Sequence, residues 1–198
     1  MATTQAQPPQ TVPLPQIVYV SFSAEINAHT TESLIAVMAN CANQRVKEVY
    51  LMLSTPGGIV MNGLNLYNVM RAMPFKLITH NVGNVDSIGN AVFLAGVERY
   101  ACPHSTFMFH GVGLNTQPNT RLEEKSTRET LNGILADQKR IGGIIGERTK
   151  LGETEIEDLF REAQTKDSTF AASCGIVHDV RDFQIPPGAT VVSLVFQR

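Results

Sequence analysis

The chain of 198 residues is 43% hydrophobic, which is enough to bury the core of one domain, so a single fold is expected. Its 16 Lys and Arg residues are balanced by 18 Asp and Glu residues, and no basic stripe is present that could follow a phosphate backbone. The composition therefore argues against nucleic acid as the main partner.

The three cysteines, Cys41, Cys102 and Cys174, are far apart and lie in apolar stretches, which is typical of buried free thiols. The sequence has no HExxH or GxxxxGK motif and no cluster of Cys and His, so neither a metal nor another cofactor is expected. No apolar run approaches the roughly 20 residues that a membrane span needs, and the amino end lacks the features of a secretion signal. We expect a cytoplasmic protein that does not interact with membranes.

Residues 1–15 are polar and rich in Pro and Gln, which predicts a disordered arm, and residues 16–198 then form the single domain. The β-rich run 17–22 predicts a first strand. Thr30 or Thr31 can cap a helix whose apolar residues recur at helical spacing, and a buried strand is expected at 48–53. Pro and two glycines in 54–58 predict a turn, followed by a helix that ends near Met73.

A third strand is expected at 77–83, followed by an almost wholly apolar helix at 87–96 that must be buried, and by short strands at 98–102 and 106–110. A longer helix is predicted from about Pro118 to Lys150, with Leu131, Ile134, Leu135, Gln138, Ile141 and Ile145 on one face. Further helices begin near Thr154 and Asp167. An edge strand is expected at 175–180, and a last strand at 190–196 that could pair with a neighbouring subunit. This alternation predicts an α/β domain.

Ser87 stands where a strand is expected to meet a buried helix. There its hydroxyl can face a cleft, while the helix N-terminus offers unpaired N–H groups to a developing anion. The alternative is that Ser87 only caps the helix. His110 ends an apolar strand and precedes Gly111, so its ring can emerge at the edge of the sheet; the alternative is a structural histidine. The turn Pro56-Gly57-Gly58 allows backbone N–H groups to approach a ligand, although it could simply end a strand.

Together, the segments STPGG (54–58), DSIGNAVFLAG (86–96) and TFMFH (106–110) resemble the proteolytic subunit of the Clp protease, which shares its fold with the crotonases. That family has a Ser-Pro-Gly-Gly turn, an Ala-Ser-Met-Gly nucleophile turn and a Met-Ile-His strand end. Here Gly58 lies 29 residues before Ser87, and His110 lies 23 residues after it. The resemblance extends from about Ile17 to Val180. It implies the ClpP/crotonase fold, a spiral of repeated β-β-α units with a long handle helix.

Carried over residue by residue, the resemblance implies a serine-type endopeptidase. Ser87 would be the nucleophile, His110 its general base, and the N–H groups of Gly58 and Ile88 the oxyanion hole. Ile59 and Val60 on one side and residues 111–114 on the other would hold a peptide or unfolded protein substrate as an added strand. The helix from Pro118 to Lys150 would be the handle through which two rings of subunits meet, so a homo-oligomeric ring is implied.

The chain departs from the family pattern in two regions that the family uses with its partner ATPase, the docking pocket and the amino end. The family docks a Clp-type ATPase in a pocket lined by aromatic side chains, whereas this chain has Tyr50 but Met52 and Ala72 at two matching positions. Only the Pro-rich arm precedes Ile17, where the family carries an axial loop and a first helix. We therefore expect peptide cleavage without ATP and little stimulation by such an ATPase.

The third member of the triad is predicted to be Asp167. Counting back from Gly175 without gaps places Ala163 at the family's aspartate position, and Asp167 fits only when the intervening segment is shortened. The competing role for Asp167 is to cap the helix that follows it, which would leave Gln164, Thr165 or a water as the partner of His110.

Two other functions fit parts of this pattern. A non-catalytic subunit could keep the fold and assemble with an active paralogue. A crotonase-like acyl-CoA enzyme would share the fold and an oxyanion hole, but that class has no need of a Ser and a His at positions 87 and 110.

Overall fold

The computed structural model describes residues 16–116 and 120–196, which form a mixed α/β structure around one sheet of eight strands. The strands are β1 (Ile17–Ser23), β2 (Glu48–Thr55), β3 (Lys76–Asp86), β4 (Glu98–Ala101), β5 (Thr106–Met108), β6 (Thr165–Asp167), β7 (Asp179–Val180) and β8 (Thr190–Ser193). The helices are α1 (Ala28–Asn43), α2 (Val60–Ala72), α3 (Gly89–Phe93), α4 (Glu124–Arg148), α5 (Glu153–Glu162) and α6 (Ser168–Ser173). The α/β prediction is confirmed, while the arm predicted at 1–15 lies outside the described residues.

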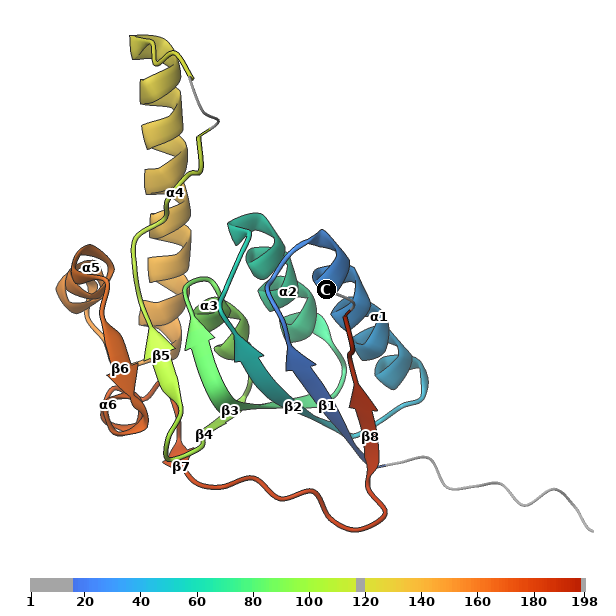
Figure 1. Ribbon diagram of the computed structural model, residues 1–198. Coiled ribbons are helices and arrows are strands. Elements are labelled where there is room, and N and C mark those ends of the chain that lie inside the picture. The colour runs from blue at the N-terminus through green and yellow to red at the C-terminus, as the bar shows by residue number, and fades with distance from the viewer. Residues whose placement is uncertain (1–15, 117–119, 197–198) are drawn as a thin grey trace, which may run out of the picture.

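The strand order places the carboxyl ends of β3 and β5 side by side. The main path of the sheet runs β6-β5-β3-β2-β1-β8, with β4 beside the first half of β3 and β7 beside β4. Residues 78–81 of β3 pair with β4, whereas residues 84–86 pair with β5. All strand pairs are parallel except β5 with β6. Right-handed connections between parallel neighbours put α1 and α2 on the same face of the sheet (Figure 1).

The core lies between the sheet and helices α1, α2 and α3. On α1, Leu34, Met38 and Cys41 are buried, as the helical spacing predicts. They face fully buried strand residues such as Leu51 and Val85 in one apolar cluster. Removing this apolar surface from water supplies most of the favourable free energy of folding.

Several predicted boundaries are corrected by the structure. The N-cap of α1 is Asn27, whose side chain accepts from the Thr30 N–H at 3.0 Å while Thr30 completes the capping box, so neither Thr30 nor Thr31 is the cap. Strand β3 continues to Asp86, because β5 extends its ladder of hydrogen bonds. The buried helix at 87–96 shortens to Gly89–Phe93.

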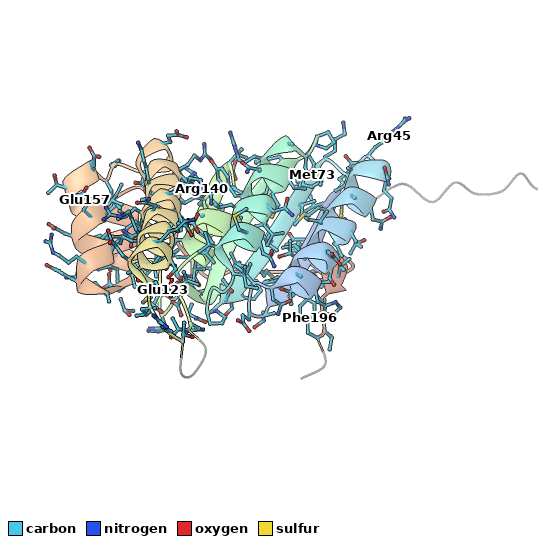
Figure 2. The ribbon with its side chains drawn as sticks, turned by 90° about the horizontal axis from the view of Figure 1, so that it is seen from above. Arg45, Met73, Glu123, Arg140, Glu157 and Phe196 are labelled. Carbon is cyan, nitrogen blue, oxygen red and sulfur yellow. The ribbon has the colours of Figure 1, made fainter. Side chains whose placement is uncertain are left out.

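The long helix α4 begins at Glu124 rather than near Pro118, which lies outside the described residues. It stands away from the sheet beside α5 (Figure 1), and Figure 2 shows the two helices next to each other at one end of the molecule. Its apolar face is only partly covered: Ile141 and Ile145 are buried, but Leu131 and Leu135 are 52% and 51% exposed. Burial along α4 therefore ends where the sheet ends.

The tail forms β8, which pairs in parallel with β1 of the same chain, so the strand predicted against a neighbouring subunit is paired within the chain. Before β8, the segment 181–189 passes along the sheet from β7 (Figure 1). The Arg181 guanidinium lies 3.4 Å from the Tyr100 ring centroid, and the Phe183 and His80 rings pack edge to face with centroids 5.7 Å apart. The segment thus covers part of the sheet face opposite α1 and α2.

Arg99 on β4 connects three chain segments. The side chain is only 5% exposed and donates to the carbonyls of Gly96, Arg148, Gly175 and Ile176, at 2.7 to 3.2 Å. Burial lowers the pKa of Arg99 to about 10. The Gly96 carbonyl also accepts from the Arg148 guanidinium at 2.9 Å. Because a buried carbonyl needs a donor, these bonds of Arg99 hold the carboxyl end of α4 against the sheet.

Candidate active site

Ser87 lies on a sharp turn between β3 and α3. Its φ of 56° is a left-handed conformation that residues with a side chain seldom adopt. The Ser87 N–H donates to the Met108 carbonyl at 2.8 Å, which ties the turn to the end of β5. A strained serine between a strand and a helix presents its hydroxyl outward, the geometry of a nucleophile elbow.

Asn90 holds this turn in place. Its amide nitrogen donates to the Ser87 carbonyl at 3.0 Å and to the Met108 carbonyl at 2.8 Å. The residue is 2% exposed, so these two bonds form out of competition with water. Sequence reasoning overlooked Asn90, although its place one turn after Ser87 on a short buried helix was a usable signal.

The Gly57-Gly58 turn packs directly against the Ser87 turn. A Cβ on Gly57 would lie 2.7 Å from both the Asp86 carbonyl oxygen and the Ser87 Cβ, and one on Gly58 would lie 2.2 Å from the Ile26 carbonyl oxygen. The φ angles of these glycines are 85° and 146°. Only glycine fits this approach of three backbone segments.

The backbone N–H groups of Gly58 and Ile88, which lie at these turns, have no acceptor among the residues that the structure describes. Gly58 forms a parallel bridge with Ile26, in which Ile26 bonds to Gly57 and Ile59, so the N–H of Gly58 itself points away from that strand. The N–H of Ile88 precedes the first helical bonds of α3. Both groups can therefore donate to an oxyanion.

His110 follows the end of β5, and its ring is fixed by its own backbone. The Nδ1 atom lies 2.7 Å from the Gly111 carbonyl oxygen. Because a carbonyl oxygen only accepts, Nδ1 must carry the hydrogen, which leaves the lone pair of the neutral ring on Nε2. This is the tautomer that a general base for a serine requires.

Ser87 and His110 both line one small pocket, in which the space open to water is about 80 Å³. The pocket is lined by Gly58, Val60, Ser87, Ile88, Phe109, His110, Val112, Gly113, Ile141 and Phe160. Among the described residues the Ser87 hydroxyl makes no hydrogen bond, including to His110; such bonds often tighten only when substrate is bound. Ile59, in contrast, is 52% exposed and lies outside this lining.

The structure does not bring Asp167 to His110. In the antiparallel pair of β5 and β6, Asp167 lies opposite Thr106, four residues before His110. Its carboxylate accepts from the Phe170 N–H at 2.8 Å as the N-cap of α6, so the helix-cap role is the one observed. Ala163, in a left-handed conformation with φ of 50°, immediately precedes the residue whose carbonyl binds the Phe109 N–H.

His80, by contrast, belongs to a separate buried cluster. Its Nδ1 accepts from the Tyr50 hydroxyl at 2.6 Å, and its Nε2 donates to the Arg181 carbonyl at 3.0 Å. Burial lowers the pKa of His80 to about 4, so the ring is neutral near pH 7. This histidine is a structural element of the sheet.

The amino-acid sequence matches the family model described as Clp protease over residues 13–183. Among solved structures, the fold is similar to that of a ClpP1 point mutant from Listeria monocytogenes, with a TM-score of 0.75 and 18% sequence identity. The superposition covers 84% of this chain and 92% of that one. At this identity the structural match establishes the fold, and the family match extends over well more than half of the chain. None of the helices in the described parts of the chain is both long and apolar enough to cross a bilayer.

Proposed function

Because the chain belongs to the Clp protease family, we propose that it is a serine endopeptidase in which Ser87 is the nucleophile and His110 the general base. The observation that carries this proposal is the strained Ser87 turn, which shares one pocket with His110 and two unpaired backbone N–H groups. These are the parts that acyl transfer needs: an exposed hydroxyl, a base of defined tautomer, and fixed donors for the oxyanion.

In the proposed reaction, the Ser87 hydroxyl attacks the carbonyl carbon of a peptide bond while Nε2 of His110 takes its proton. The N–H groups of Gly58 and Ile88 donate to the oxyanion of the tetrahedral intermediate. Its collapse breaks the C–N bond, and the imidazolium gives its proton to the leaving amine. Water, activated by the same Nε2, then hydrolyses the acyl-serine and restores the hydroxyl.

The lining of the pocket favours an apolar side chain beside the scissile bond. Val60, Phe109, Val112 and Phe160 present apolar surface to the pocket, so an apolar side chain of the substrate would lose water there at little cost. The substrate would lie as an added strand between residues 59–60 and 111–114. Peptides or unfolded proteins with an apolar residue at the cleaved position are therefore the expected substrates.

The test is labelling with a fluorophosphonate, which reacts only with an activated serine. The wild type is expected to be labelled at Ser87, whereas Ser87→Ala is not, and Ser21→Ala, which replaces a serine on β1, is expected to label like the wild type. An assembled wild-type protein that resists labelling would instead support a non-catalytic family subunit. The observation that favours this second function is that, within the described residues, no carboxylate binds the His110 ring.

We also propose assembly into a homo-oligomeric ring, because the uncovered Leu131 and Leu135 on α4 need a partner surface. Sedimentation should give a species several times the 21.6 kDa of one chain. An active species at the monomer mass would contradict this.

A Clp-type ATPase is expected to stimulate peptide cleavage little, because Tyr50 is already bonded to His80, and Phe183 packs on the same cluster. Strong ATP-dependent degradation of a folded protein would overturn that expectation.

A further inference from the structure

The peptide group that joins Gly111 to Val112 is bonded at both ends. Its carbonyl accepts from Nδ1 of His110 at 2.7 Å, and its N–H, on Val112, donates to Oε1 of Gln138 at 3.1 Å. Gln138 lies on α4, far from His110 in sequence. A peptide whose N–H is bound to an acceptor is a more strongly polarised acceptor at its own carbonyl.

The preceding bonds leave this peptide little freedom. The Gly111 N–H donates to the Phe160 carbonyl at 3.0 Å, and the Phe109 N–H donates to the Gln164 carbonyl at 2.9 Å. These two bonds fix the chain on the α5 and β6 side, while Gln138 fixes the next peptide from α4. The direction of the Gly111 carbonyl, and with it the plane of the His110 ring, is thus set by contacts from both sides.

The close approach of Gln138 depends on Gly111 having no side chain. A Cβ at this position would lie 2.7 Å from Oε1 of Gln138, the end of a flexible side chain. An alanine there would displace the Gln138 amide rather than the backbone. The arrangement therefore offers two independent ways to break the same contact.

We propose that Gln138 is a positioning residue for His110, acting through the Gly111–Val112 peptide, and that this peptide takes the place of the acidic residue in a Ser-His-Asp triad. The inference rests on the proposed function of Ser87 and His110. It accounts for a histidine that has the tautomer of a general base while Asp167 is occupied as a helix cap. A neutral acceptor held by a second hydrogen bond can orient the ring and hold the proton on Nδ1.

The test compares two substitutions of nearly equal size. Gln138→Glu keeps an oxygen acceptor for the Val112 N–H, whereas Gln138→Met removes it. The rate of fluorophosphonate labelling at Ser87 is expected to fall roughly tenfold in Gln138→Met, the equivalent of one lost hydrogen bond, and to stay within roughly threefold in Gln138→Glu. If Gln138 served only to fill space, Gln138→Met would keep a labelling rate at least as high as that of Gln138→Glu. Equal rates in the two variants would overturn the proposal, and Gln44→Met, at an exposed position, is the control.

Gly111→Ala supplies a second arm. It is expected to lower the rate like Gln138→Met, and the double variant should be no slower than either single one, because both break one contact. Fully additive losses would count against the proposed role of Gln138.

Magic-angle-spinning ¹⁵N NMR of histidine-labelled protein measures the tautomer of His110 independently of enzymatic activity, and His110→Asn assigns the signal. Wild type should show Nδ1–H at His110 and Gln138→Met a mixture. An unlabelled wild type would refute the proposed function, whereas an unchanged tautomer in Gln138→Met would refute this inference.

Discussion

Replacing His80 by Gln tests whether a buried neutral histidine limits the stability of the sheet at acidic pH. The ring is fully buried between the Tyr50 hydroxyl and the Arg181 carbonyl, with Tyr100, Phe183 and Cys102 also against it. Gln can offer one donor and one acceptor in the same place but has no proton to gain. The variant therefore separates the hydrogen bonds of His80 from its titration.

The magnitude follows from the pKa of His80, which burial lowers from 6.5 to about 4 in the folded chain. Well above pH 6.5 the ring is neutral in both states, so its titration contributes almost nothing. As the pH falls below 6.5, the unfolded chain binds a proton that the folded chain excludes, and the free energy of unfolding decreases. Linkage gives a loss of about 2 kcal/mol at pH 5 and about 3 kcal/mol at pH 4.

Urea denaturation at about pH 7.5, 6 and 5 measures this effect. His80→Gln should be less stable than wild type at the highest pH but should lose about 2 kcal/mol less than wild type between about pH 7.5 and pH 5. His104→Gln, at an exposed turn, should follow the wild-type pH dependence. If wild type and His80→Gln decline in parallel, the reasoning about His80 is wrong.

Three further changes test the site and its frame. Gly58→Ala places a Cβ 2.2 Å from the Ile26 carbonyl oxygen at a φ of 146°. It should lower the free energy of unfolding by about 1–3 kcal/mol, as measured by thermal melting, and abolish fluorophosphonate labelling of Ser87. Arg99→Leu removes a donor from four carbonyls, of which that of Gly96 also accepts from Arg148, and should cost about 3–5 kcal/mol in urea titrations. Asp167→Asn should leave peptidase rate and melting unchanged, whereas Asp167→Ala should cost about 1 kcal/mol of stability only.

Matched controls exist for these changes. Gly133→Ala, on an exposed part of α4 with open space around its Cα, should not reduce stability. Arg140→Leu removes an exposed arginine and should change stability by less than about 1 kcal/mol. A tolerated Gly58→Ala or Arg99→Leu would contradict the packing described, and a large drop in rate for Asp167→Asn would return that residue to the catalytic site.

Local patterns in the sequence were sufficient for the α/β class, for most strands and helices, and for the turn positions of Gly58 and Ser87. Alternating apolar residues, glycines and prolines act over a few neighbouring residues, so they are readable without the fold. The sequence was insufficient where a boundary depends on a distant strand. Strand β3 reaches Asp86 because β5 pairs with its end, and β6 was overlooked because three residues carry no periodic signal.

The surroundings of His110 were decided by tertiary structure alone. From the sequence, the candidate partners of the ring, Asp167, Gln164 and Thr165, could be compared only by counting residues along the chain. An error of a few residues in that count exchanges one end of β6 for the other. The antiparallel register of β5 with β6 sets Asp167 opposite Thr106. Gln138 on α4 accepts a hydrogen bond from the Val112 N–H, 26 positions earlier in the chain. A contact between residues so far apart produces no local pattern in the sequence. Residue types therefore determined which chemistry is available. The pairing of β6 with β5, and the contact of α4 with the segment after β5, determined which groups reach the histidine.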